Sequence, residues 1–224
     1  MSLVLDDIKK AVIRSQHCQR NFDLAQTMPQ EDVDLLVYSA ANCPSKQNIS
    51  FYNLHVITDQ ETISRIHDVS QGATAVSKNT GERKIVTNSQ VLANVLFVFE
   101  KKTRAQMSDR LDINDAKADH DLDSMFDLDE AEDHKMFLRD QDTAIGIAAG
   151  YLNIVASMMG YETGCCQCFD LDAVTEVLGL EGQPTLLMGI GFKDATRNRR
   201  EHPLDSDLVF SIKKKEGIDV RVIA

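Results

Sequence analysis

The stretch Cys43-Pro44-Ser45-Lys46-Gln47-Asn48 lies where the sequence changes from a helical to a strand-like pattern. Residues 30–42 before it carry apolar side chains at helical spacing, and residues 53–58 after it read as an apolar strand. A junction rich in Pro, Ser, Gln and Asn brings hydroxyls, amides and free backbone N–H groups into one small volume. That inventory suits a flat ligand with polar edges, although an ordinary Pro-Ser loop has the same composition.

Further predicted elements on either side of this junction define the fold class. Helices are expected at residues 5–16, 30–42, 143–161 and 171–178. Thr27-Met28-Pro29-Gln30 reads as a capping box for the second helix, and Asp170 and Gly179 read as the caps of the last one. Strands are expected at residues 53–58, 91–99, 185–192, 208–212 and 218–223. We therefore predict one α+β domain over residues 1–224, with a central, mainly antiparallel sheet flanked by helices.

The composition limits the classes of function. Of 224 residues, 43% are hydrophobic and 26% are charged, which is ordinary for a globular protein, and the net charge is −11. Nucleic-acid binding needs a basic face, so we expect no nucleic-acid partner. The first residues lack the basic and apolar regions of a signal peptide, which predicts a cytoplasmic protein.

Residues 143–161 carry no charged residue and approach the length of a membrane span. Gly146, Gly150 and Asn153 interrupt this segment and acidic residues flank it, so we predict a buried helix and no membrane contact. A helix that is apolar on every side must be covered on every side. The two glycines, four residues apart, would let another helix approach closely, and a partner subunit is a natural cover.

Residues 109–142 hold 13 Asp and Glu against four Lys and Arg. Five of the acidic residues match ligand positions of a calcium-binding EF-hand loop: Asp119, Asp121, Asp123, Asp127 and Glu130. Clustered carboxylates suit Ca²⁺, but Ser124 stands where such a loop needs glycine for its sharp turn. The alternative is a solvated insertion between a strand and the long helix.

Three more motifs accompany the Pro-Ser junction. They are Gln16-His17-Cys18-Gln19-Arg20-Asn21-Phe22, Gly164-Cys165-Cys166-Gln167-Cys168, and Gly189-Ile190-Gly191-Phe192 followed by Arg197-Asn198-Arg199-Arg200. Taken in this order, the set resembles the nitroreductase family over residues 5–100 and 140–204. The resemblance implies FMN as cofactor, NAD(P)H as hydride donor, and an intertwined homodimer with the flavin at the subunit interface. It also implies that the acidic insertion, at about residues 101–141, serves as a lid.

The resemblance implies which residues bind the flavin phosphate. The family motif often reads Arg-Arg-Ser-x-Arg or Lys, and the matching positions here are Gln16, His17, Cys18 and Arg20. Arg20 is the strongest candidate, because a guanidinium is always charged and bonds a phosphate through two N–H groups. Neutral Gln16 and Cys18 depart from the family pattern. The later cluster could restore the charge, and its best matches to the family's basic pair are Arg197 and Arg199.

The resemblance also implies which residues contact the flavin ring. The family's Pro-Ser-x-x-Asn motif matches Pro44, Ser45, Lys46, Gln47 and Asn48. A further polar contact is expected from Asn88, with Lys84 as the rival position. The backbone N–H groups of the segment Cys165, Cys166, Gln167 and Cys168 match the family loop that reaches flavin N5 and O4. Donors there would stabilise negative charge on the reduced ring.

The cysteines support a different interpretation. Five cysteines are too few and too clustered for a disulfide scaffold, which indicates reduced thiols. Cys165 and Cys168 have C-x-x-C spacing, typical of a redox or zinc element, with His17 or Cys18 as a further ligand. We expect no thioredoxin-like motif, because no predicted strand opens onto these residues. Small buried residues beside a cofactor would give the same pattern, and we expect no metal ligands.

Two functions remain at this point. The first is an FMN enzyme that transfers hydride from NAD(P)H through flavin N5 to a nitroaromatic, a quinone or a similar small acceptor, with ping-pong kinetics and no catalytic side chain. The second is a non-catalytic thiol redox sensor or calcium-binding module. A visible spectrum of the purified protein separates the two, because only a flavoprotein is yellow.

Overall fold

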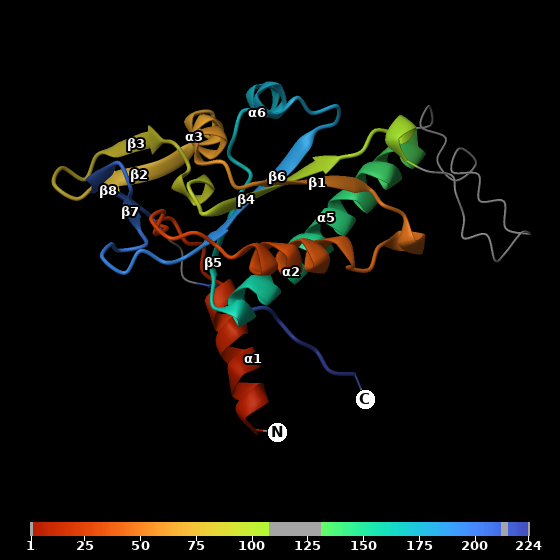
Figure 1. The fold of residues 1–224 in the computed structure, drawn as a ribbon, viewed down its shortest axis with the longest axis horizontal. Coiled ribbons are helices and arrows are strands. Elements are labelled where there is room, and N and C mark those ends of the chain that lie inside the picture. The colour runs from red at the N-terminus through yellow and green to blue at the C-terminus, as the bar shows by residue number, and fades with distance from the viewer. Residues whose placement is uncertain (1, 108–130, 212–214, 224) are drawn as a thin grey trace, which may run out of the picture.

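The computed structural model describes residues 2–107, 131–211 and 215–223. A four-stranded antiparallel sheet forms its centre, in the order β1 (Tyr52–Ile57), β4 (Val95–Lys101), β6 (Pro184–Gly191) and β5 (Glu162–Cys166). Figure 1 shows this sheet between two layers of helices. The predicted α+β class with a mainly antiparallel central sheet is therefore confirmed.

The side chains of β4 alternate between two hydrophobic clusters, which places this strand at the centre of the core. Val95, Phe97 and Phe99 pack beneath α2 (Gln30–Ala41) and α5 (Ala131–Met159). Leu96 and Val98 pack on the opposite face against α3 (Gln60–Asp68) and α6 (Leu171–Leu178). Because successive strand side chains point to opposite faces, a nearly all-apolar strand must be covered on both.

A second antiparallel sheet lies beside the first, at the left of Figure 1. Its strand order is β3 (Arg83–Val86), β2 (Ala73–Ser77), β8 (Asp205–Phe210) and β7 (Glu201–His202). Helix α1 (Ser2–Ser15) projects from the body, and three short 3₁₀ turns connect the elements: η1 (Lys46–Asn48), η2 (Ser89–Val91) and η3 (Arg104–Gln106).

Most of the expected elements form within a few residues of their predicted bounds. Asp170 caps α6 by accepting a hydrogen bond from the Ala173 N–H, and Gly179 ends it in the left-handed conformation, as predicted. The capping box at residues 27–30 was wrong, because Pro29 is the N-cap of α2 and no side chain caps this end. The predicted strand at 91–99 starts later, since η2 occupies Ser89–Val91.

Two further expectations were wrong. Residues 218–223 form no strand, and the side chains of Ile218, Val220, Val222 and Ile223 are exposed. A strand does open onto the cysteine motif, because β5 ends at Cys166. Sequence reasoning missed β5 together with α3, β2, β3 and β7. The EF-hand match at 119–130 lies outside the described residues, as does most of the predicted insertion. Residues 131–141 of that insertion belong instead to α5, which begins at Ala131 and not at the predicted residue 143.

Helix α5 is long and apolar enough to span a membrane by length and composition alone. Core helices of soluble proteins satisfy the same test, so this finding is weak evidence for a membrane. In this single subunit α5 is covered on one side only, and Gly146, Gly150, Tyr151 and Met158 are exposed. A Cβ added at either glycine would meet nothing within 4 Å. Within the described part of one subunit, one face of α5 therefore remains exposed, although the sequence predicted a helix covered on every side.

Candidate functional site

The N-terminal motif runs in an extended path against β5 and the loop before β7. Backbone hydrogen bonds join the Gln19 N–H to the Thr163 carbonyl at 2.7 Å. The side-chain amide of Asn21 donates to the carbonyls of Asn198 and Glu201 at 2.7 and 2.9 Å. A Cβ on Gly164 would lie 2.6 Å from the Gln19 carbonyl oxygen, so only glycine permits this approach. Residues far apart in sequence are thereby held in one place.

Arg20 lies within this arrangement with unused donor capacity. Its guanidinium stacks over the Phe210 ring, 4.7 Å from the centroid, and its Nε is buried without a hydrogen-bond partner in the described structure. Burial lowers the Arg20 pKa, Cys18 raises it, and the like charges of Arg199 and Arg200 lower it again. A buried orphan donor among three guanidiniums favours an anion, so these residues fit a phosphate group.

The three arginines after β6 differ in how they are engaged. Arg197 lies beside Asp194, with Nε 3.6 Å from Oδ2, and also donates to the Pro203 carbonyl. Arg200 Nε donates to the Phe210 carbonyl at 3.1 Å. Arg199 makes no hydrogen bond or ion pair with any described residue and is half-buried. Arg199 is thus the predicted residue of the basic pair that is available to a ligand.

The cysteine segment brings Asn88 into the same region. Asn88 caps η2 and donates from Nδ2 to the Cys166 sulfur at 3.0 Å. The rival Lys84 lies on exposed β3. Gln167 and Cys168 are exposed, and Cys168 has an ordinary negative φ, so its backbone is not strained. Asn88 is therefore the better placed of the two candidates.

The thiols beside Arg20 are poor nucleophiles. Burial raises the pKa of Cys165 to about 12, with Cys18 and Cys166 adding to the shift. Burial likewise raises the pKa of Cys166 to about 12. A reactive redox cysteine has a lowered pKa, so these two behave as small buried packing groups. Within the described ranges no group of three His, Cys, Asp or Glu is placed to hold a metal ion.

We expect Cys165 and Cys166 to resist alkylation at pH 8, because a group whose pKa is about 12 is almost entirely protonated there. The exposed Cys168 should react first with iodoacetamide. Peptide mass spectrometry after timed labelling measures the order. Labelling of Cys166 as fast as Cys168 at pH 8 would restore the thiol redox interpretation.

The Pro-Ser junction forms a strained loop that contacts the N-terminal half of α5. Gln47 and Asn48 have φ values of 52° and 58°, and no other non-glycine residue in the described ranges has a positive φ. Such backbone strain is concentrated at functional sites. Lys46 Nζ lies 2.6 Å from Asp140 Oδ2 near the start of α5. Ser45 and Asn48 line a cavity of about 750 Å³.

The predicted site residues therefore fall into two groups. The basic group comprises Gln16, His17, Cys18, Arg20, Asn88, Cys165, Cys166, Gln167, Cys168, Arg197 and Arg199. The loop group comprises Pro44, Ser45, Lys46, Gln47 and Asn48. The loop group contacts α5 through the ion pair between Lys46 and Asp140. The basic group lies near Asn153 of α5, which donates to the carbonyl of Ser15, the residue before the N-terminal motif. These two helix positions are about 20 Å apart at 1.5 Å per residue. The two groups therefore contact α5 at different positions along its length.

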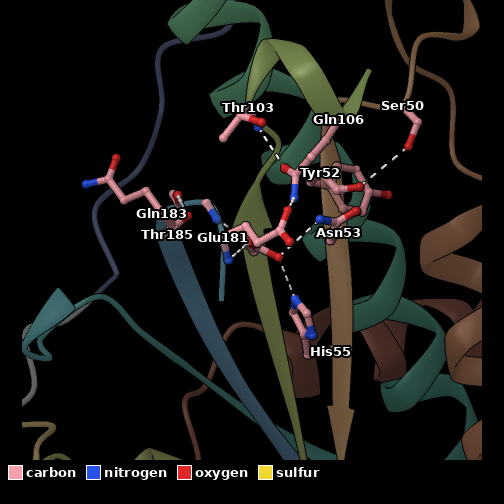
Figure 2. Close-up of polar contacts among 11 residues, drawn as sticks. Ser50, Tyr52, Asn53, His55, Thr103, Gln106, Glu181, Gln183 and Thr185 are labelled. Carbon is pink, nitrogen blue, oxygen red and sulfur yellow. Dashed lines mark hydrogen bonds and ion pairs between the residues drawn. The ribbon is translucent and has the colours of Figure 1, made fainter. Parts of the chain in front are cut away.

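Glu100, which sequence reasoning missed, holds the sheet together beside the loop group. It is 2% exposed, and its carboxylate accepts from His55 Nε2 at 2.6 Å, Asn53 Nδ2 at 3.1 Å and the Glu181 N–H at 3.1 Å. Its fourth donor is the Gly182 N–H. Figure 2 shows Asn53, His55 and Glu181 converging on one point from β1 and from the loop before β6. An acidic residue directly after the apolar run of β4 was the available signal.

The comparisons with known proteins agree with this geometry. The model of the nitroreductase family matches residues 13–192. The fold is similar to the NfrA1 nitroreductase from B. subtilis, at 18% identity and a TM-score of 0.61, over 85% of this chain and 68% of that one. It is also similar to nitroreductase A from Vibrio parahaemolyticus, at 15% identity and a TM-score of 0.60, over 95% and 78% of the two chains.

A third similar structure is named as an NAD(P)H:FMN oxidoreductase from Staphylococcus epidermidis, at 15% identity and a TM-score of 0.58, over 85% of this chain and 89% of that one. No curated protein sequence matches the chain. Because the family model spans most of its length, the chain belongs to the nitroreductase family of oxidoreductase enzymes.

Proposed function

We propose that this protein is an FMN-dependent oxidoreductase that transfers hydride from NAD(P)H to a nitroaromatic, a quinone or a similar small acceptor in the cytoplasm. It acts as a homodimer in which each flavin lies between the basic group of one subunit and the loop group of the other. The observation that carries this proposal is the buried, unpartnered Nε of Arg20 among like charges. Neither half-site alone contains the residues expected around a whole flavin.

The chain's residues would divide the work of holding FMN. Arg20 and Arg199 would bind the phosphate, because both have donors not used by described residues and their mutual repulsion falls when an anion binds. The backbone of residues 166–168 would face the N5 edge of the ring, and Asn88 would lie beside it through its contact with Cys166. Bound FMN would supply the ring that takes a hydride from the nicotinamide and passes electrons to the acceptor.

The exposed apolar residues support the dimer. Several large hydrophobic side chains have no cover in one subunit, and they lie on α1, α5 and the C-terminal segment: Val4, Leu5, Ile8, Val12, Tyr151, Met158, Ile218, Val220 and Val222. Large exposed apolar surfaces are typical of protein–protein contacts. An interface of the obligate class, over roughly 2,000 Å², would bury it.

Arg20→Ala is expected to weaken FMN binding by about 1.5–3 kcal/mol, which is the range for a hydrogen bond to a charged group. Arg20→Lys should lose less, because the charge remains although the planar fork does not. Titration of apoprotein with FMN, followed by flavin fluorescence, gives both values. Equal FMN affinity in Arg20→Ala and the wild type would remove Arg20 from the site.

The proposal also predicts the form of the kinetics. Donor and acceptor would use the same open face of the ring in turn. The reciprocal initial rate, plotted against the reciprocal NAD(P)H concentration at several fixed acceptor concentrations, should therefore give parallel lines. Intersecting lines would contradict a shared site. The thiol-sensor alternative gains no support from Cys165 and Cys166, whose raised pKa values oppose reactivity.

A further inference from the structure

A second cavity, of about 670 Å³, adjoins the basic group on the side of α1. Its lining residues come from α1, the N-terminal motif, β5 and the segments flanking the arginine cluster: Lys9, Lys10, Ile13, Arg14, His17, Gln19, Glu162, Lys193 and Arg199. Arg20 and Arg197 line a different, smaller cavity of about 270 Å³. The two cavities have different lining residues but are neighbours, because Arg199 of the larger one interacts electrostatically with Arg20 of the smaller one.

The charge of this cavity is opposite to that of the whole chain. Five cations face one carboxylate, Glu162, which gives a formal charge of +4 in a chain whose net charge is −11. Such a local excess raises the concentration of an anionic ligand at the site.

The cations are engaged to different degrees. Lys9 and Lys10 lie near Asp6 and Asp7 on exposed i,i+3 positions, contacts that contribute little in water. Arg14 lies 3.9 Å from Glu162 and donates to the Ser157 carbonyl at 3.2 Å. Lys193 and Arg199 make no ion pair with a residue of the described ranges, but Arg199 is assigned to the flavin phosphate. Lys193 is therefore the cation of this cavity that can turn to a second ligand without losing a partner.

The walls of the cavity are fixed by the fold. Lys193 lies between two backbone hydrogen bonds, from the Asp23 N–H to the Phe192 carbonyl at 2.8 Å and from the Asp194 N–H to the Asn21 carbonyl at 3.0 Å. On α1, the lining positions 9, 10, 13 and 14 form one helical face. The exposed apolar positions 4, 5, 8 and 12 form another, so the proposed dimer contact does not compete for the cavity.

We propose that this cavity binds the 2′-phosphate on the adenosine side of NADPH, so that the enzyme prefers NADPH to NADH. This inference rests on the proposed function. Glu162 at the cavity and Cys166 at the expected ring position are the two ends of β5, about 13 Å apart at strand rise. A dinucleotide with its nicotinamide over the ring would have to span about this distance to place its 2′-phosphate in the cavity. Basic side chains are the usual partners of a 2′-phosphate, which NADH lacks.

The test is a calorimetric titration of FMN-saturated protein with 2′,5′-ADP and with 5′-AMP. Because the flavin phosphate is already bound, only a second phosphate site can discriminate between the two probes. The wild type should bind 2′,5′-ADP at least about tenfold more tightly than 5′-AMP. The double variant Lys10→Gln with Lys193→Gln should lose about tenfold of the 2′,5′-ADP affinity and keep its FMN affinity within about twofold.

A matched control removes two exposed cations elsewhere, Arg65→Gln with Lys135→Gln, and should leave both probes and FMN unchanged. Equal binding of the two probes by the wild type would overturn the inference. So would a loss of FMN affinity in the cavity variant, which would assign the cavity to the flavin phosphate. If the chain bound no FMN at all, the proposed function would fail, and the same titration of the apoprotein would still decide whether this cavity selects a 2′-phosphate.

Discussion

Gly150→Trp is expected to separate the two subunits and release the flavin in the same step. Within one subunit the change meets no obstacle, because position 150 is exposed and an added Cβ has no neighbour within 4 Å. Replacing a glycine inside a helix should even favour α5 by up to about 1 kcal/mol. A loss of assembly would therefore report on contacts that exist only in the dimer. Sedimentation at low micromolar concentration and the visible flavin absorbance of the same sample measure the two effects.

The control places the same side chain on an exposed helix across the sheet. The Glu61→Trp variant should remain dimeric and yellow, since α3 packs on the face of the central sheet opposite to α5. A Gly150→Trp protein that sediments as a dimer and retains its FMN would contradict the assignment of this face of α5 to the interface. Loss of flavin from a protein that stays dimeric would count against the dependence of the site on assembly.

Glu100→Ala is expected to lower the free energy of unfolding by about 3–5 kcal/mol, the cost of removing one member of a buried charged network. The change leaves donors from Asn53, His55, Glu181 and Gly182 without their acceptor. In a domain of this size the melting temperature should fall by between about 6 and 20 °C. Calorimetry at matched protein concentration measures it, since the stability of a dimer depends on concentration.

The pKa of Glu100 adds a pH signature to this prediction. Burial raises the pKa of Glu100, but the hydrogen bonds from His55, Gly182 and Asn53 together lower it by more. The net effect is a pKa below the ordinary value of 4.5. A lowered carboxylate pKa stabilises the fold above the ordinary value, and the stabilisation is lost as pH falls through the folded-state pKa. The difference in the free energy of unfolding between the wild type and Glu100→Ala should therefore become smaller below about pH 4.

The exposed carboxylate of Glu176 on α6 provides the comparison. Glu176→Ala should shift the melting temperature by no more than about 2 °C, because surface substitutions change stability by roughly 0.5 kcal/mol or less. If the melting temperature of Glu100→Ala also differed from that of the wild type by no more than about 2 °C, the carboxylate would not hold β1 and the loop before β6 in place.

Local sequence patterns predicted the helices and strands that are determined by their own side chains. The helix at 171–178 was predicted with both caps because Asp170 and Gly179 act within a turn of their own positions. The apolar run of β4 predicted a central strand, although Val91 belongs to a 3₁₀ turn instead. β5 was missed because Glu162 and Gly164 have low strand propensity, and its pairing with β6 is a long-range contact.

The strand expected at 218–223 shows what alternation cannot decide. Ile218, Val220 and Val222 alternate as a strand would, yet a strand forms only beside a neighbour with free backbone groups. In the described part of one subunit the segment pairs with no such neighbour and stays exposed. A partner subunit with an open sheet edge at β1 would complete the pattern that the sequence carries.

The candidate site was predicted in its residue types but not in its arrangement. The sequence resemblance pointed to Arg20, Asn88 and the Pro-Ser loop, yet no periodicity reveals that the two groups contact α5 at positions about 20 Å apart, Asp140 and Asn153. The choice of Arg199 over Arg197 also required the structure, because only contacts with Asp194 and Pro203 show that Arg197 is engaged.

A mixed dimer tests the shared flavin site most directly. One chain carries Arg20→Ala and the other carries Ser45→Phe, each with its own affinity tag so that the mixed dimer is purified. If each site takes Arg20 from one subunit and the loop group from the other, one of the two sites in the mixed dimer is intact. We predict that it binds one FMN per dimer with wild-type affinity, while each variant homodimer binds about tenfold more weakly or not at all. A mixed dimer with no site of wild-type affinity would contradict a flavin site shared between subunits, because Arg20 and the loop group of each site would then belong to the same subunit.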